Sequence, residues 1–108
     1  MDKKLFKLLL IALFSTSAFA NSNSEINLLD LYKDLHSNPE LSYKEFETSR
    51  KLSLILEELG YEITNGVGGN GVVALLKNGE GKTVMLRADM DGLPVEEKTG
   101  ASYASRTK

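Results

Sequence analysis

The sequence predicts an α/β fold in which two helices are followed by three short strands. Apolar residues recur at i, i+3, i+4 and i+7 over residues 28–35 and again over 52–59, which is the stripe of an amphipathic helix. Residues 72–76 are continuously apolar, as in a strand covered on both faces. Two helices cannot cover both faces of such a sheet, so we expect an incomplete domain.

The first helix has a predicted start and a firmer predicted end. Ser22 and Glu25 have the spacing of a capping box, in which the serine and glutamate side chains accept hydrogen bonds at the helix start. Pro39 forces the preceding residue out of the helical region. The helix should therefore end near Ser37 or Asn38.

The second helix carries signals at both ends. Ser42 and Glu45 again have capping-box spacing. Gly60 follows the apolar stripe directly, where a left-handed residue commonly ends a helix. We expect a helix between these two signals.

Three strands are predicted after Gly60. Residues 61–64 alternate in polarity, 72–76 are apolar throughout, and 83–88 form a third apolar segment. The turn residues 78–81 join the second strand to the third. The chain then passes into the segment Asp89-Met90-Asp91-Gly92-Leu93-Pro94.

Composition excludes several functions. A length of 108 residues allows one small domain, and a net charge of −2 provides no basic surface for nucleic acid. The chain has no cysteine, so neither a disulfide framework nor a thiolate metal site can form within it.

Residues 1–20 have the pattern of a signal peptide. Three lysines in the first seven residues precede the apolar run 8–14, and Ala18 and Ala20 supply the small residues of a cleavage site. The run is too short for a stable membrane span, which needs roughly 20 apolar residues. We expect export to the periplasm or outside the cell after cleavage following Ala20, with residues 21–108 as the mature domain. An uncleaved anchor is the alternative.

Residues 66–71 match the pattern G-x-G-x-x-G of dinucleotide-binding loops. Such a loop must open a helix, whose N-terminus holds the pyrophosphate. Here an apolar, β-branched segment follows, so a tight reversal between two strands is favoured.

His36 is the only histidine. An imidazole can bind a metal or act as a base, but a metal site needs further ligands. A structural role near the end of the first helix, where the helix dipole favours positive charge, is the preferred interpretation.

Asp89 and Asp91 follow a predicted strand, at the edge where open α/β sheets place their ligands. Residues two apart in an extended segment point to the same side, so both carboxylates could face one crevice. A solvated acidic turn is the alternative, and two carboxylates alone do not make a hydrolytic site.

Several motifs in one register resemble a known family. Residues 34–42 are similar to its Leu-His-x-x-Pro-Glu-Leu signature, 66–73 to its G-x-G-G-x-G-V-V segment, and 86–94 to its LRADMDALP segment, with Gly92 in place of the commoner alanine. The resemblance covers about residues 28–106. It is to the hippurate hydrolase, N-acyl-amino-acid amidohydrolase and indole-acetyl-amino-acid hydrolase family of metallopeptidases.

This resemblance implies the N-terminal part of an α/β/α catalytic domain, without the lid domain through which family members dimerise. It implies hydrolysis of the amide bond of N-acyl or aroyl amino acids or peptides by a homo-oligomer. The cofactor would be a divalent metal: zinc, manganese, cobalt or nickel.

Two site residues carry over from the resemblance. Asp91 matches an aspartate that orients a metal ligand, and Asp89 occupies the position of a metal-binding histidine in the wider superfamily. The family's ligand segment, Cys-Gly-His-Asp-Gly-His, is expected beyond Lys108, so no metal ligand is expected within this chain. We therefore expect the chain to be inactive alone. The alternative is a small exported binding or interaction module.

Overall fold

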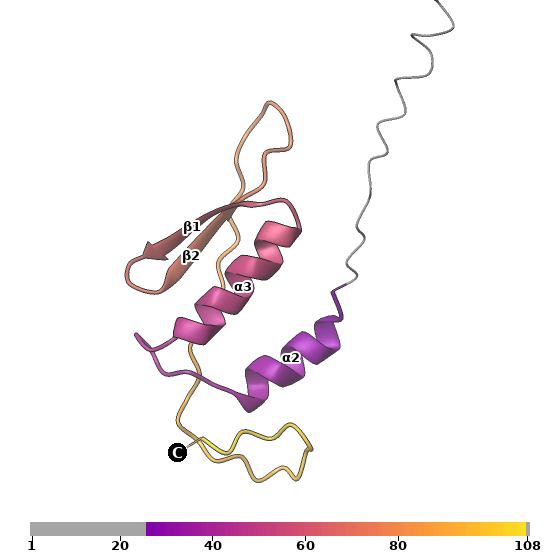
Figure 1. The fold of residues 1–108 in the computed structure, drawn as a ribbon, viewed down its shortest axis with the longest axis vertical. Helices are drawn as coiled ribbons and strands as arrows, with labels where there is room; N and C mark the ends of the chain where they lie inside the picture. The colour runs from indigo at the N-terminus through magenta and orange to yellow at the C-terminus, as the bar shows by residue number, and fades with distance from the viewer. Residues whose placement is uncertain (1–25, 108) are drawn as a thin grey trace, which may run out of the picture.

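The computed structural model describes residues 26–107 and arranges them as two helices followed by two antiparallel strands (Figure 1). The elements in chain order are α2 (Leu28–Ser37), α3 (Phe46–Glu58), β1 (Glu62–Val67) and β2 (Gly71–Leu75). The predicted α/β class is confirmed. The predicted signal peptide and the Ser22–Glu25 pair lie outside the described residues. Within residues 26–107, neither helix has the length and apolar character needed to cross a bilayer.

Helix α2 begins with an asparagine cap. The side-chain oxygen of Asn27 accepts hydrogen bonds from the backbone N–H groups of Leu29 at 3.1 Å and Asp30 at 3.2 Å. These two N–H groups have no partner inside the helix, so the cap stabilises the first turn. The helix ends at Ser37, as the proline at position 39 predicts.

The start of α3 differs from the prediction. Ser42 and Glu45 do not form a capping box, because α3 begins at Phe46 with Glu45 as its N-cap, and the Glu45 side chain accepts from the N–H of Tyr43 rather than that of Ser42. The carboxylate of Glu40 takes this role instead. Its Oε1 accepts from the N–H of Glu47 at 3.1 Å, and its Oε2 accepts from the N–H of Thr48 at 2.7 Å. A residue outside the helix therefore satisfies two orphan donors of its first turn.

The end of α3 is as predicted. Gly60 adopts a left-handed φ of 87°. Its N–H donates to the carbonyl of Glu57 at 2.9 Å, and the N–H of Tyr61 donates to the carbonyl of Leu56 at 3.0 Å. This pair of bonds is the Schellman motif, which satisfies carbonyls at the end of the helix and turns the chain towards β1.

Helix α3 lies between the hairpin and α2 (Figure 1). On the hairpin side, the buried Ser53 hydroxyl donates to the side-chain oxygen of Asn65 in β1 at 2.6 Å. On the other side, Lys51 forms an ion pair with Asp34 of α2. Polar contacts thus connect α3 to both neighbours.

The strand β2 is covered on one face only, contrary to prediction. Val73 remains 50% exposed, and no hydrophobic residue in the described part of the chain is buried. Because β2 pairs with β1 alone, and because α3 packs on one side of the hairpin, the second apolar face has no cover.

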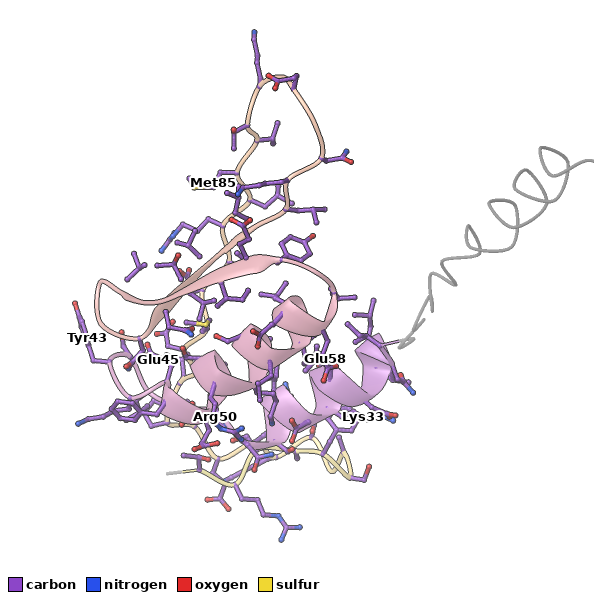
Figure 2. All side chains as sticks on the ribbon, turned by 45° about the horizontal axis from the view of Figure 1, so that its top comes forward. Lys33, Tyr43, Glu45, Arg50, Glu58 and Met85 are labelled. Atoms are coloured by element: carbon purple, nitrogen blue, oxygen red, sulfur yellow. The ribbon has the colours of Figure 1, made fainter. Side chains whose placement is uncertain are left out.

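The predicted third strand is not formed. Residues 83–88 have no regular structure, and Val84 and Leu86 are 83% and 94% exposed. Met85 lies well away from both helices (Figure 2). A strand exists only when a neighbour accepts and donates its backbone hydrogen bonds. Within residues 26–107 the sheet contains only β1 and β2. The apolar pattern of residues 83–88 therefore predicts a strand whose pairing partner is not found in this part of the chain.

We predict that Gly60→Ala destabilises α3, because alanine is strained at a φ of 87°. The expected loss is about 1 kcal/mol. Gly60→Asn should cost less, since asparagine tolerates the left-handed region. Urea unfolding followed by far-ultraviolet circular dichroism measures both. Equal stability of the alanine variant and the parent would contradict the Schellman assignment.

Candidate functional site

Residues 89–105 fold back beside α2 and α3 (Figure 1). Together with residues of both helices they line a pocket of about 490 Å³. The pocket has aliphatic walls and three carboxylates among its lining residues. The walls include Leu35, Pro39 and Leu52, and the carboxylates belong to Asp89, Asp91 and Glu97.

The structure places both predicted aspartates on the lining of this one pocket. Both side chains are exposed to solvent. Asp89 is paired with Arg87, whose Nη2 lies 2.6 Å from the Asp89 Oδ1. The two carboxylates therefore share a crevice, and their role in catalysis stays a prediction.

The turn that carries the aspartates is held by one backbone hydrogen bond and packs closely against Pro39. The N–H of Gly92 donates to the carbonyl of Glu40 at 2.6 Å. A Cβ at position 92 would lie 2.4 Å from the Cβ of Pro39, closer than any real contact. Glycine is therefore the residue that fits here, and an alanine would require Pro39 or the turn to shift.

His36 lies in the last turn of α2, where the dipole interpretation places it. The structure adds a partner that the sequence did not indicate. The Nε2 of His36 lies 2.6 Å from the Oε2 of Glu97, and its ring packs against Tyr32 and Tyr103 at centroid distances of 5.4 Å and 5.6 Å. The histidine thus attaches the C-terminal segment to α2.

Glu97 gathers three hydrogen bonds. The hydroxyl of Thr99 donates to its Oε1 at 2.6 Å, while His36 and the N–H of Ser105 contact its Oε2 at 2.6 Å and 3.2 Å. The Thr99 hydroxyl and then the His36 ring hold the pKa of Glu97 below its ordinary value, against the opposing effect of desolvation. Sequence reasoning missed this residue, because no periodic pattern connects positions 36 and 97.

The glycine-rich segment 66–71 is a reversal between two strands. This confirms the interpretation that the sequence favoured over a dinucleotide-binding loop. The segment joins β1 to β2, so a strand follows it where a dinucleotide-binding loop would open a helix. Gly66, Gly68 and Gly69 adopt positive φ values of 77°, 66° and 119°. The Asn70 amide donates to Glu45 Oε2 at 3.0 Å, and this bond is the leading cause of a lowered pKa at Glu45. Figure 2 shows Glu45 beside this reversal.

The described residues do not by themselves fit a metal centre. Between residues 26 and 107, no group of three or more histidine, cysteine, aspartate or glutamate side chains is arranged to hold a metal ion. Asp89 and Asp91 are two exposed carboxylates, one of them already paired with an arginine. Further ligands would be needed to hold a divalent cation.

We predict that acid weakens the attachment of residues 97–105 to α2. Because the pKa of Glu97 is lower in the folded state than in the unfolded state, its stabilisation is present at neutral pH and is lost as the pH falls through the lowered value. The near-ultraviolet circular dichroism of Tyr32 and Tyr103, recorded from pH 7 to pH 3, measures the change. Glu97→Gln should reduce the signal at neutral pH and flatten its acid dependence. Glu80→Gln, in an exposed loop, is the matched control, and an identical titration in all three proteins would refute the assignment.

Comparison with known proteins identifies relatives by sequence. No family model and no solved structure matches the chain. The chain is 46% identical over 83 residues to thermostable carboxypeptidase 2 of Saccharolobus solfataricus, covering 75% of this chain and 21% of the relative. It is 43% identical over 88 residues to N-acetyl-L-cysteine deacetylase of Bacillus subtilis, covering 81% and 21%.

A third relative is hippurate hydrolase of Campylobacter jejuni, at 44% identity over 73 residues, covering 67% of this chain and 19% of the relative. The chain thus spans about a fifth of the length of these relatives. Identity at this level over most of the chain establishes common descent, and the chain belongs to the amidohydrolase family that includes hippurate hydrolase and N-acetylcysteine deacetylase.

Proposed function

We propose that this chain contributes one wall of the active site in an enzyme that hydrolyses the amide bond of N-acyl or aroyl amino acids. The observation that carries the proposal is 43–44% identity to N-acetyl-L-cysteine deacetylase and hippurate hydrolase. Hippurate and N-acetyl-L-cysteine are both amino acids with an acylated amino group. Within the described chain, such a substrate would bind at the pocket lined by Asp89 and Asp91.

Within this proposal the two aspartates act differently. Asp91 orients a neighbouring ligand of a divalent cation by accepting its hydrogen bond, as second carboxylates do in many metal sites. Asp89 sits beside it and is partly neutralised by Arg87. The cation would be zinc, manganese, cobalt or nickel, with its ligands supplied by residues outside 26–107. The intact enzyme would be a homo-oligomer acting on a small molecule.

A chimera with a full-length relative tests this function. Residues 28–106 replace the matching stretch of the Campylobacter jejuni hippurate hydrolase. We expect the chimera to hydrolyse hippurate. Asp91→Asn should lower kcat/KM by about 10–100-fold, the usual effect of removing a partner of a metal ligand. Asp89→Asn should have a smaller effect. Hippurate turnover followed by released glycine is the measurement.

The controls separate folding from chemistry. Glu80→Gln should leave the chimera unchanged, because residue 80 lies in an exposed loop. The 108-residue chain alone is expected to release no glycine from hippurate, with or without added zinc or manganese. A folded chimera without activity, or an Asp91→Asn chimera as active as its parent, contradicts the proposed role.

We also propose that the protein is exported. The pattern of residues 1–20 supports this, and cleavage is expected after Ala20. Expression of the full chain followed by N-terminal sequencing should yield a mature form that begins at Asn21. Ala20→Lys should block cleavage, because the peptidase requires a small residue at this position. A mature protein that retains Met1 in the cytoplasm would refute export.

A further inference from the structure

Glu40 makes hydrogen bonds to two separate parts of the structure. Its carboxylate accepts from the first turn of α3, at 3.1 Å from the N of Glu47 and 2.7 Å from the N of Thr48. Its backbone carbonyl accepts from the N–H of Gly92 at 2.6 Å. One residue thus joins the start of α3 to the turn that carries Asp91.

The approach of Gly92 to Pro39 leaves no room for a side chain in this structure. A Cβ at position 92 would lie 2.4 Å from the Cβ of Pro39 and 3.2 Å from its Cα. Pro39 in turn has a φ fixed by its ring. The backbone of residues 39–40 therefore lies directly against Gly92 and accepts its hydrogen bond. Asp91 is the adjacent residue in the chain.

The bond between Glu40 and α3 is charge-assisted. Burial raises the pKa of the carboxyl group, but the N–H groups of Thr48 and Glu47 outweigh it and bring the pKa below its ordinary value. Glu40 is therefore ionised at neutral pH. An ionised carboxylate at a helix N-terminus gains from both the hydrogen bonds and the helix dipole.

We propose that Glu40 is a positioning residue, which holds the Asp89-Met90-Asp91 turn at the pocket by anchoring residues 39–40 to the start of α3. The mechanical link rests on the contacts above. Its effect on hydrolysis rests in addition on the proposed function. Glu40 itself touches no reacting atom in this proposal.

Amide hydrogen exchange in the full 108-residue chain tests the link. In the parent, the Gly92 amide should exchange more slowly than in an unstructured peptide. Glu40→Ala should accelerate exchange at Glu47, Thr48 and Gly92 together by about fivefold, a typical effect of losing a helix cap. Glu40→Gln keeps one acceptor oxygen and should give an intermediate acceleration at the same three amides.

Glu45→Ala is the matched control. It also removes a glutamate at the start of α3, but Glu45 contacts Asn70 and the N–H of Tyr43 rather than Gly92. It should change exchange at Gly92 by less than about twofold. The link is refuted if the parent Gly92 amide is unprotected, if Glu40→Ala leaves Gly92 unchanged, or if Glu45→Ala accelerates it equally.

The hippurate hydrolase chimera tests the consequence for catalysis. Glu40→Ala should lower kcat by about 10-fold with KM unchanged, and Glu40→Gln should recover part of the loss. An unchanged kcat refutes the positioning role. If the parent chimera is inactive, the proposed function fails, while the exchange experiment still decides the link between Glu40 and Gly92.

Discussion

The N–H groups in the first turn of α3 have no partner inside the helix, and the carboxylate of Glu40 satisfies two of them. The arrangement of the site depends on this interaction. It fixes the connection between α2 and α3, and the carbonyl of the same residue then receives the turn at Gly92. If this cap were lost, the first turn of α3 and the turn at Gly92 would no longer be connected through Glu40.

Polar contacts have unusual weight in this fold because apolar burial is slight. Among residues 26–107 the buried residues are Thr48, Ser53 and Ser105, and none is hydrophobic. The polar contacts that join separate parts of the chain include a hydroxyl to an amide (Ser53 to Asn65), an ion pair (Lys51 to Asp34) and the pair formed by His36 and Glu97. The contact made by Glu97 depends on pH, because the pKa of its carboxyl group is lowered in the folded chain.

The features that could be predicted correctly from the sequence are those determined by residues adjacent in the chain. The end of α2 before Pro39, the left-handed Gly60 and the glycine-rich reversal all follow from local backbone preferences. The predicted cap of α3 was wrong because the capping carboxylate belongs to Glu40, which lies outside the capping-box spacing. The prediction of a third strand was wrong because a strand needs a hydrogen-bonding partner, and a hydrophobic pattern alone does not show whether that partner is present.

The candidate site divides in the same way. Asp89 and Asp91 could be proposed from their local spacing, and both lie on the lining of one pocket although the strand expected before them is not formed. Their role stays a prediction. Glu97 and Glu40 were missed because their importance arises from contacts 61 and 8 residues away in sequence. Long-range hydrogen bonds leave no periodic trace, so only the folded structure reveals them.

The unpaired segment 83–88 has a consequence for how the molecule behaves in a crowded solution. Val84 and Leu86 are exposed, and a stretch of exposed β-branched and apolar residues with no strand partner is prone to pair with another chain. Lys82 and Arg87 flank the apolar stretch, and Arg87 is itself paired with Asp89. Charged residues beside an exposed apolar stretch are a feature that opposes aggregation between copies.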